Sequence, residues 1–292
     1  MNQEPTRRSV LAGFAGGAAL ASAPAGRARM RFGFTSYQWG ADWDLASLIA
    51  NCAKAHAYGV ELRTTMKHAH GVELALSASE RGEVKRRFAT SPVKLIGLAC
   101  GERFDSPDPA KLQASLAAAQ SYVKLAADVG APGLRVFPND WQKNVPRERT
   151  IEQIGKSLGA LGRFARDYGV QIRLENHGTA GRFETLRSIL EIAAEPNVRV
   201  KLNCDARDAE GGNFAAKFAL VQPYLGHTLH MHELDGPDQK FPYQLQFDLL
   251  VRAKWAGWCL VEATRKVPDR VAALIALRKS WENMIAEAEK GV

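Results

Sequence analysis

Residues 170–205 read VQIRLENHGTAGRFETLRSILEIAAEPNVRVKLNCD, and this stretch decides the fold. Apolar and β-branched residues over 170–177 and again over 198–205 are typical of buried strands, and the segment 182–195 between them has helical spacing. A strand, a helix and a second strand in this order predict a βαβ unit, which joins two parallel strands of one sheet.

The same alternation extends along the chain in both directions. The expected strands are 31–37, 60–64, 94–100, 133–138, 170–177, 198–205, 228–234 and 258–263, and the expected helices lie near 44–57, 78–90, 108–129, 148–168, 182–195, 213–224, 243–255 and 269–288. Eight such units predict an α/β fold, a single (β/α)8 TIM barrel over residues 30–290. A doubly wound open sheet also alternates, but no glycine-rich GxGxxG sequence follows the first strand.

The first 25 residues differ from the rest of the chain. Arg7 and Arg8 precede a glycine-diluted apolar run over 12–21, and small residues over 21–25 offer cleavage sites. This layout is typical of an exported protein, and the paired arginines resemble a twin-arginine signal. The sequence therefore predicts a signal peptide over 1–25, recognition by the twin-arginine export machinery, and a periplasmic or otherwise exported protein.

Composition excludes several classes of protein. With 46% hydrophobic and 24% charged residues among 292, the chain is typical of a globular protein rather than a disordered one. The net charge is +8, but the longest basic run is Lys85–Arg87, so we expect a solvated basic surface and no nucleic-acid partner. No segment is apolar enough to predict a membrane span. The four cysteines lack metal-binding spacing, which favours buried free thiols over a zinc site or disulfides.

Ionisable residues gather where the predicted strands end, which is where a TIM barrel places its chemistry. Glu175, Asp205, His232 and Glu262 come from four consecutive predicted strands. Carboxylate oxygens with one imidazole suit a divalent ion of intermediate hardness. We therefore expect one divalent metal ion on these four residues, with manganese favoured and magnesium, cobalt or zinc also suitable.

Further polar residues share the same strands and alternate toward the barrel interior. The candidates for substrate binding are Glu61, Arg63, Arg135, His177, Lys201 and His230. Arg63 and Arg135 could hold a phosphate or carboxylate, or could pair internally with Glu61 or Glu175.

Two further groups stay open between a site and a structural role. His68 and His70 follow the second predicted strand, at the site or exposed on the surface. Trp39, Trp141 and Phe137 could stack on a sugar or simply pack at the barrel mouth.

The chain resembles the sugar phosphate isomerase/epimerase family of xylose isomerase-like barrels, which also includes ketose 3-epimerases, inosose dehydratases and endonuclease-four-type nucleases. The resemblance is carried by Gly59–Arg63, His68–Val72, Gly133–Val136, Leu174–His177, His230–Asp235 and Val261–Glu262. In this family the order Glu, Asp, His, Glu on strands five to eight forms the metal set. Two departures leave the substrate open: Asp208 stands where the family often has a histidine, and His232–Asp235 lacks the lysine of the usual His-x-Lys-Asp.

The resemblance implies a metal-dependent isomerase or epimerase acting on a carbohydrate, a sugar phosphate or a keto-sugar, with Glu175 and Glu262 moving a proton next to a carbonyl. A keto-sugar lyase or dehydratase begins with the same proton abstraction. A periplasmic carbohydrate-binding barrel that has lost turnover is the non-enzymatic alternative. A nuclease is disfavoured because such sites need more metal ligands. The oligomeric state stays open.

Overall fold

The computed structural model describes residues 29–235 and 240–291. The predicted signal peptide, with Arg7 and Arg8, lies outside the described residues. Among the described residues, no helix combines the length and the apolar character that crossing a membrane requires.

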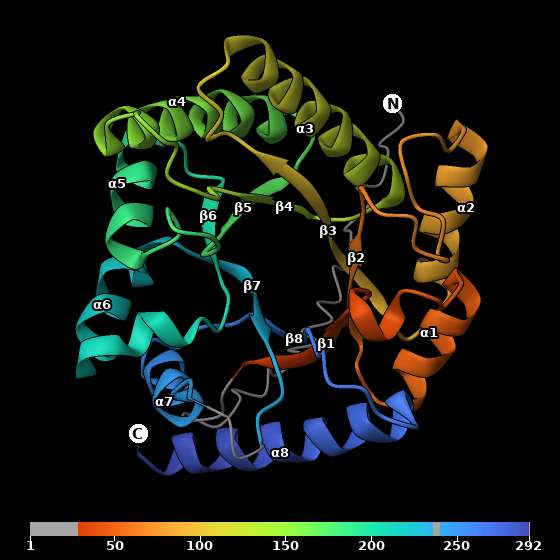
Figure 1. Ribbon diagram of the computed structural model, residues 1–292. Coiled ribbons are helices and arrows are strands. Elements are labelled where there is room, and N and C mark those ends of the chain that lie inside the picture. The colour runs from red at the N-terminus through yellow and green to blue at the C-terminus, as the bar shows by residue number, and fades with distance from the viewer. Residues whose placement is uncertain (1–28, 236–239, 292) are drawn as a thin grey trace, which may run out of the picture.

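Eight parallel strands form a closed barrel in sequence order, with β8 pairing to β1 (Figure 1). The strands are β1 (Arg31–Thr35), β2 (Gly59–Arg63), β3 (Lys94–Arg103), β4 (Gly133–Phe137), β5 (Gln171–Glu175), β6 (Val198–Leu202), β7 (Leu225–Met231) and β8 (Trp258–Val261). The predicted TIM barrel is therefore confirmed.

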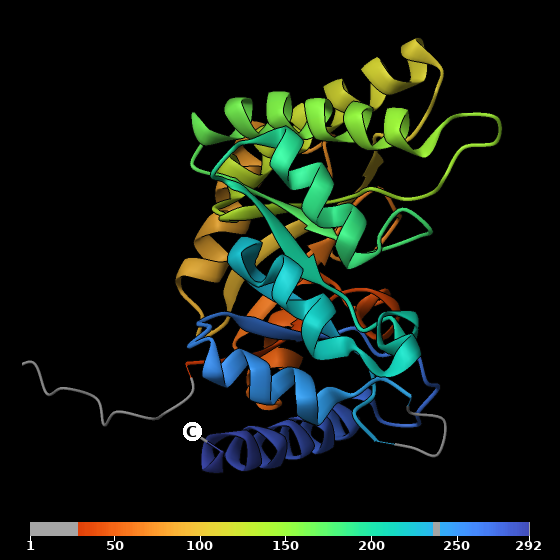
Figure 2. The same cartoon turned by 90° about the vertical axis from the view of Figure 1, so that its left-hand side faces the viewer.

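A ring of helices surrounds the strands, and Figure 2 shows the loops that follow the strands gathered at one end of the barrel. The helices are α1 (Leu45–Lys54), α2 (Ala78–Ala89), α3 (Pro109–Val129), α4 (Arg147–Arg166), α5 (Phe183–Ala193), α6 (Phe214–Val221), α7 (Tyr243–Arg252) and α8 (Arg270–Lys290), with short 3₁₀ segments η1 (Gln38–Gly40), η2 (Ala206–Gly212) and η3 (Gln222–Tyr224).

Local sequence explains where several helices begin and end. Asp44, Asp108 and Asp269 each accept backbone N–H groups of the following turn, and Ser77 forms a reciprocal capping box with Glu80. Buried apolar side chains fill the layer between these helices and the strands. All four cysteines are buried free thiols, as the sequence predicts.

Strands β6 and β7 each end three residues earlier than predicted, and side-chain hydrogen bonds explain why. After β6, the N–H of Asn203 donates to the side chain of Asn176, and the N–H of Cys204 donates to Asn203 Oδ1 at 2.8 Å. After β7, the N–H of His232 donates to Tyr243 Oη at 2.9 Å. These bonds compete with the sheet ladder and turn the chain away from it. Strand alternation therefore stops before Asp205 and before His232.

The inside of the barrel is polar. Arg135, Arg173 and Lys201 are among the largest fully buried side chains of the described residues. Gly97 on β3 makes room for this layer, because a Cβ there would lie 2.8 Å from Arg173 Nη1 and 3.4 Å from Glu61 Oε2. Buried charges are costly unless they are paired or bind a ligand, so each of these groups needs a partner.

Candidate functional site

Three predicted site residues meet at the carboxyl ends of β5, β7 and β8. One ligand-type atom from each of Glu175, His230 and Glu262 lies within 4.8 Å of the others. Among the described residues this is the one such group of histidine, cysteine and acidic side chains. We call these three residues the central cluster.

His230 is oriented by a buried carboxylate beneath it. Its Nε2 lies 2.9 Å from Glu61 Oε1, and Nε2 must donate because an ionised carboxylate can only accept. Its Nδ1 then faces the cluster, 3.1 Å from Glu262 Oε2 and 3.6 Å from Glu175 Oε2. Burial alone would lower the pKa of His230, but the carboxylates of Glu262 and Glu175 raise that pKa to about 10.

Glu61 also forms an ion pair at the centre of the barrel. Lys201 Nζ lies 2.5 Å from Glu61 Oε1, and both side chains are fully buried. Burial raises the pKa of Glu61, yet Lys201 and His230 outweigh it and hold that pKa well below its usual range. Burial lowers the pKa of Lys201 against the opposing pull of Glu61. Glu61 and Lys201, both predicted to bind substrate, therefore pair with each other beneath the central cluster.

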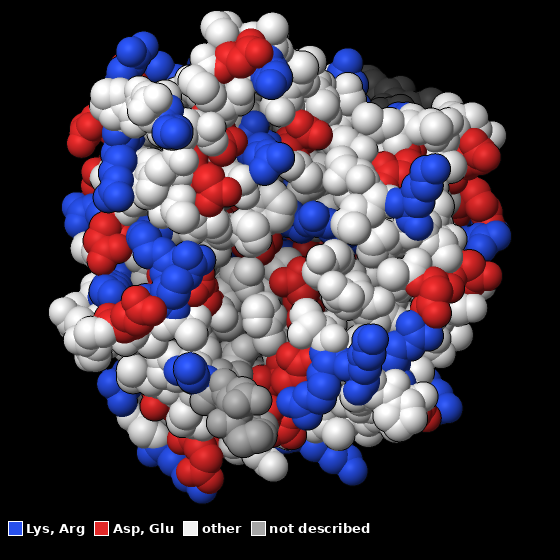
Figure 3. Space-filling model, in the orientation of Figure 1, with Lys and Arg blue, Asp and Glu red and all other residues white. Residues whose placement is uncertain are grey.

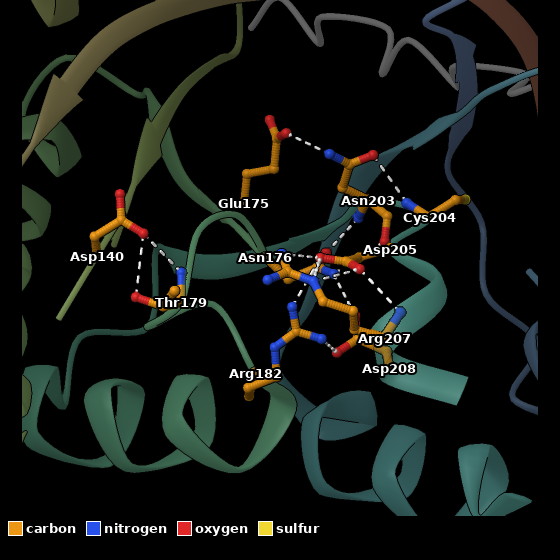
Figure 4. Close-up of polar contacts among 10 residues, drawn as sticks. All are labelled: Asp140, Glu175, Asn176, Thr179, Arg182, Asn203, Cys204, Asp205, Arg207 and Asp208. Carbon is orange, nitrogen blue, oxygen red and sulfur yellow. Dashed lines mark hydrogen bonds and ion pairs between the residues drawn. The ribbon is translucent and has the colours of Figure 1, made fainter. Parts of the chain in front are cut away.

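Glu175 is held from two sides. Arg135 Nε lies 3.0 Å from its Oε2. On the other side, Asn203 Nδ2 donates to its Oε1 at 2.9 Å, as Figure 4 shows. Despite burial, Arg135 and His230 lower the pKa of Glu175, and His230 does the same for Glu262. Of the two roles that the sequence left open for Arg135, the structure contains the internal ion pair, with Glu175 as the partner. Asn203 was not among the predicted site residues, although it shares a strand face with Lys201.

Asp205 does not join the central cluster. It lies at the start of η2, where Arg182 Nη2 donates to its Oδ2 at 2.7 Å and Arg207 Nη2 donates to the same oxygen at 2.5 Å (Figure 4). Burial would raise its pKa, but Arg207 and Arg182 lower that pKa to about 2. Arg182 Nη1 also donates to Asp208 Oδ1 at 2.8 Å. Both carboxylates are therefore saturated by protein donors.

His232 lies at the rim rather than inside the barrel. Its Nε2 is 3.6 Å from Glu262 Oε2, and its side chain is 36% exposed. It borders a cavity of about 550 Å³ at the barrel mouth, together with His177, Asn203 and Asp205. Figure 3 looks onto this mouth, where acidic and basic side chains both border a central hollow.

The remaining candidates lie around the same opening. His177 is exposed, and its ring lies 4.5 Å from that of Phe137. His68 and His70 are buried rather than on the surface: His68 Nδ1 lies 3.1 Å from Ser36 O and His70 Nε2 lies 3.0 Å from Arg63 O. Trp39 is buried and donates to Arg265 O.

The central cluster has the chemistry of a metal centre. Glu175 Oε2 and His230 Nδ1 are buried and make ion-pair contacts, with Arg135 and Glu262 respectively, but no contact of either atom has hydrogen-bond geometry. A divalent cation between them would displace the Nδ1 proton and bind both atoms. Two carboxylates and one imidazole also leave coordination positions open for substrate oxygens. The residues present therefore fit a divalent ion.

Comparison with known proteins agrees with this architecture. The family model described as xylose isomerase-like TIM barrel matches residues 49–284. No curated protein matches the chain.

Three solved structures are similar in fold. An L-ribulose 3-epimerase has a TM-score of 0.73 at 15% identity, with 90% of this chain and 96% of that chain covered. A 3-keto-D-glucoside 4-epimerase from E. coli has a TM-score of 0.71 at 13% identity, with 87% and 99% covered. An IolI protein with a bound zinc atom has a TM-score of 0.71 at 17% identity, with 89% and 99% covered. At these identities the likeness shows the shared fold.

Proposed function

The chain belongs to the xylose isomerase-like TIM barrel family, and from that premise we propose that it is a metal-dependent isomerase or epimerase of a carbohydrate. The observation that carries the proposal is the convergence of Glu175, His230 and Glu262, with buried atoms that make no hydrogen bond, at the carboxyl end of the barrel. The sugar epimerases among its structural neighbours support the same reaction class.

We propose that Glu175, His230 and Glu262 hold one divalent ion: manganese, magnesium, cobalt or zinc. The chemistry such an ion supplies is Lewis-acid polarisation of the carbonyl of a bound sugar. His230 replaces His232 in this assignment because its Nδ1 faces both carboxylates. Asp205 is left out because arginines occupy its oxygens.

The protein's own residues then move the proton. Glu175 and Glu262 have lowered pKa values, so both are ionised at neutral pH and can accept a proton from the carbon next to the carbonyl. Arg135 and Asn203 fix the position of the Glu175 carboxylate, and the side chain of Glu262 is 12% exposed toward the mouth. In isomerisation, the carboxylate that takes the proton becomes the acid that returns it at the neighbouring carbon. In epimerisation, the other carboxylate first gains a proton from solvent and delivers it to the opposite face, and the first releases its proton to solvent.

Exchange of that proton with solvent tests the proposal. Metal-loaded protein incubated in heavy water with a panel of ketoses and keto-glycosides should incorporate deuterium next to the carbonyl, as read by NMR. Glu262→Gln should remove the exchange. Glu233→Gln is the matched control and should retain most of it, because glutamine keeps the oxygen that accepts from the N–H groups of Thr264 and Arg265. Exchange without interconversion but with loss of water would point to the lyase. An absence of exchange with every substrate would overturn the proposal.

We also propose export of this protein by the twin-arginine route, which is understood to carry folded proteins. Folding before export would allow a weakly bound ion such as manganese to be captured away from competing zinc and copper. Replacing Arg7 and Arg8 with lysine should leave the protein in the cytoplasm, as fractionation would reveal. Unchanged export of that variant would exclude the route.

A further inference from the structure

One cation at the barrel mouth has no acidic partner. Arg63 ends β2 and is partly buried, and its buried Nε has no hydrogen-bond partner. Among the described residues no carboxylate pairs with it, whereas Arg135 and Arg182 both have carboxylate partners. A guanidinium offers five N–H donors, and a partly buried one without an acceptor is costly unless a ligand provides it.

Arg63 faces the opening rather than the outer helices. Glu61, two residues earlier on β2, points into the barrel centre toward Lys201 and His230, so strand alternation turns Arg63 to the same side, nearer the mouth. Its guanidinium carbon lies 5.5 Å from the ring centre of Tyr37 and 5.6 Å from that of Phe137. Aromatic rings hold the plane of a guanidinium and leave its N–H edges free for bidentate bonds.

The backbone around Arg63 is fixed on both sides. Its N–H donates to Ser36 Oγ at 2.8 Å, and its carbonyl accepts from His70 Nε2 at 3.0 Å. His70 Nδ1 in turn accepts from the N–H of Val72, which settles Nε2 as the protonated nitrogen. The loop histidines therefore position this arginine instead of binding a ligand themselves. Such preorganisation lowers the entropic cost of binding.

The ring of Phe137 lies between Arg63 and Arg135, the ion-pair partner of Glu175 in the central cluster. Phe137 lies 3.9 Å from the guanidinium carbon of Arg135, which pairs with Glu175, and the same ring contacts Arg63. Arg63 comes from β2 and the cluster from β5, β7 and β8, so they border the mouth from different sides. A sugar whose carbonyl lies at the cluster would reach Arg63 with its far end.

We propose that Arg63 is the anion-binding residue of the substrate site, and that the substrate is a keto-sugar carrying a terminal carboxylate or phosphate. The inference rests on the proposed function for the position of the carbonyl, and on Arg63 for the anionic group. Arg135 already pairs with Glu175 and Lys201 with Glu61, and a divalent ion on the central cluster would offset the charge of Glu262. Arg63 is therefore the cation left for a ligand. The net charge of +8 would also attract an anionic substrate.

Calorimetric titration of the metal-loaded protein with three probes tests the inference. The probes are D-fructose, D-fructose 6-phosphate and D-fructuronate, which separate a neutral end from a phosphate and a carboxylate. At least one anionic probe should bind about ten-fold or more tightly than fructose, the range expected for a charge-assisted bidentate bond. Arg63→Met should remove that preference and change the affinity for fructose less than about three-fold.

Arg31→Met is the matched control. Arg31 also stacks on an aromatic ring, 4.3 Å from that of Trp258, but at the amino-terminal end of β1, away from the mouth. The Arg31→Met variant should keep the full preference for the anionic probe over fructose. Equal binding of all three probes, or the same loss in both variants, would overturn the inference. Anion binding that depends on Arg63 without proton exchange would support it while overturning the isomerase proposal.

Discussion

Glu175 and Asp205 follow neighbouring strands of the barrel, yet their surroundings are opposite. Glu175 points inward, and its buried Oε2 has one ion-pair contact, with Arg135, and no hydrogen bond. Asp205 lies on the rim, where Arg182 and Arg207 occupy its carboxylate. Both are acidic residues that the sequence predicts at the carboxyl ends of neighbouring strands. The difference shows that free lone pairs, set by where each strand ends, decide which carboxylate can bind a ligand.

The comparison extends to the ion pairs of the two regions. Glu61 and Lys201 are fully buried, whereas the side chain of Arg207 beside Asp205 is 49% exposed. Removing one partner of a buried pair leaves an uncompensated charge in the interior. An exposed pair is screened by water and contributes little.

The largest expected effect is therefore on stability. Lys201→Met should lower the free energy of unfolding by about 3–5 kcal/mol, because Glu61 would lose its main counter-charge. Arg207→Met should lower it by less than about 1 kcal/mol. Urea unfolding followed by circular dichroism measures both. Similar losses of unfolding free energy in the two variants would mean that burial does not strengthen the Lys201–Glu61 pair relative to the exposed Arg207–Asp205 pair.

The next effect is on metal binding. Glu175→Gln should weaken the affinity for manganese by about 100-fold or more, because loss of a charged ligand costs at least as much as loss of a group that only orients one, and it should abolish proton exchange. Asp205→Asn should keep both within about three-fold, since its oxygens serve arginines. Equilibrium dialysis with metal analysis measures the affinity. If Asp205→Asn loses metal and Glu175→Gln does not, the assignment of the two regions is reversed.

A pH-dependent effect is expected on the rim. Burial raises the pKa of Asp208 to about 7, against the opposing influence of Arg182. The folded protein then binds a proton more strongly than the unfolded chain, where the pKa is near 3.8. The contribution of this group to stability is therefore largest below pH 4 and declines as the pH rises toward 7.

Asp208→Asn should remove that decline. Between pH 5 and pH 8 the free energy of unfolding of the wild type should fall by about 2 kcal/mol more than that of the variant. Urea titrations at the two pH values give this difference. Parallel pH profiles would show that Arg182 keeps Asp208 ionised throughout.

The sequence predicts the barrel well because periodicity is local information. Each strand and helix was expected within a few residues of its observed position, and Glu175 and Glu262 lie at the carboxyl ends of β5 and β8. The errors arise where side chains end a strand. Asn176 captures the N–H of Asn203, and Tyr243 captures that of His232, across 27 and 11 residues of sequence respectively. Alternation counted past those points brings Asp205 and His232 inward, whereas Asn203 and His230 hold the inward positions.

The sequence also could not predict which interior charges pair with one another. Arg63 and Arg135 are the same residue type on two predicted strands, so composition offers no reason for one to pair and the other to stay free. The structure separates them because Arg135 on β4 reaches Glu175, two residues beyond its register partner Arg173 on β5. The register partner of Arg63 on β3 is Ala99, and two residues beyond it lies Gly101, so neither position supplies a carboxylate.

The smallest expected effect concerns the position between the two regions. Asn203 donates to Glu175 Oε1, so Asn203→Asp would replace a donor with a second negative charge beside that carboxylate. Without metal, repulsion should lower the free energy of unfolding by about 1 kcal/mol. With metal, the added charge should raise the affinity for manganese by about ten-fold, because a carboxylate is a stronger ligand for such ions than an amide. Binding to the folded state stabilises it, so the melting temperature should fall below that of the wild type in chelator and rise more steeply with added manganese.

Asn213→Asp, which adds the same charge at an exposed position before α6, should show neither change. If Asn203→Asp responds to manganese as the wild type does, Asn203 does not face the ion. Asp205 on the rim would then be the residue after β6 to test as a ligand.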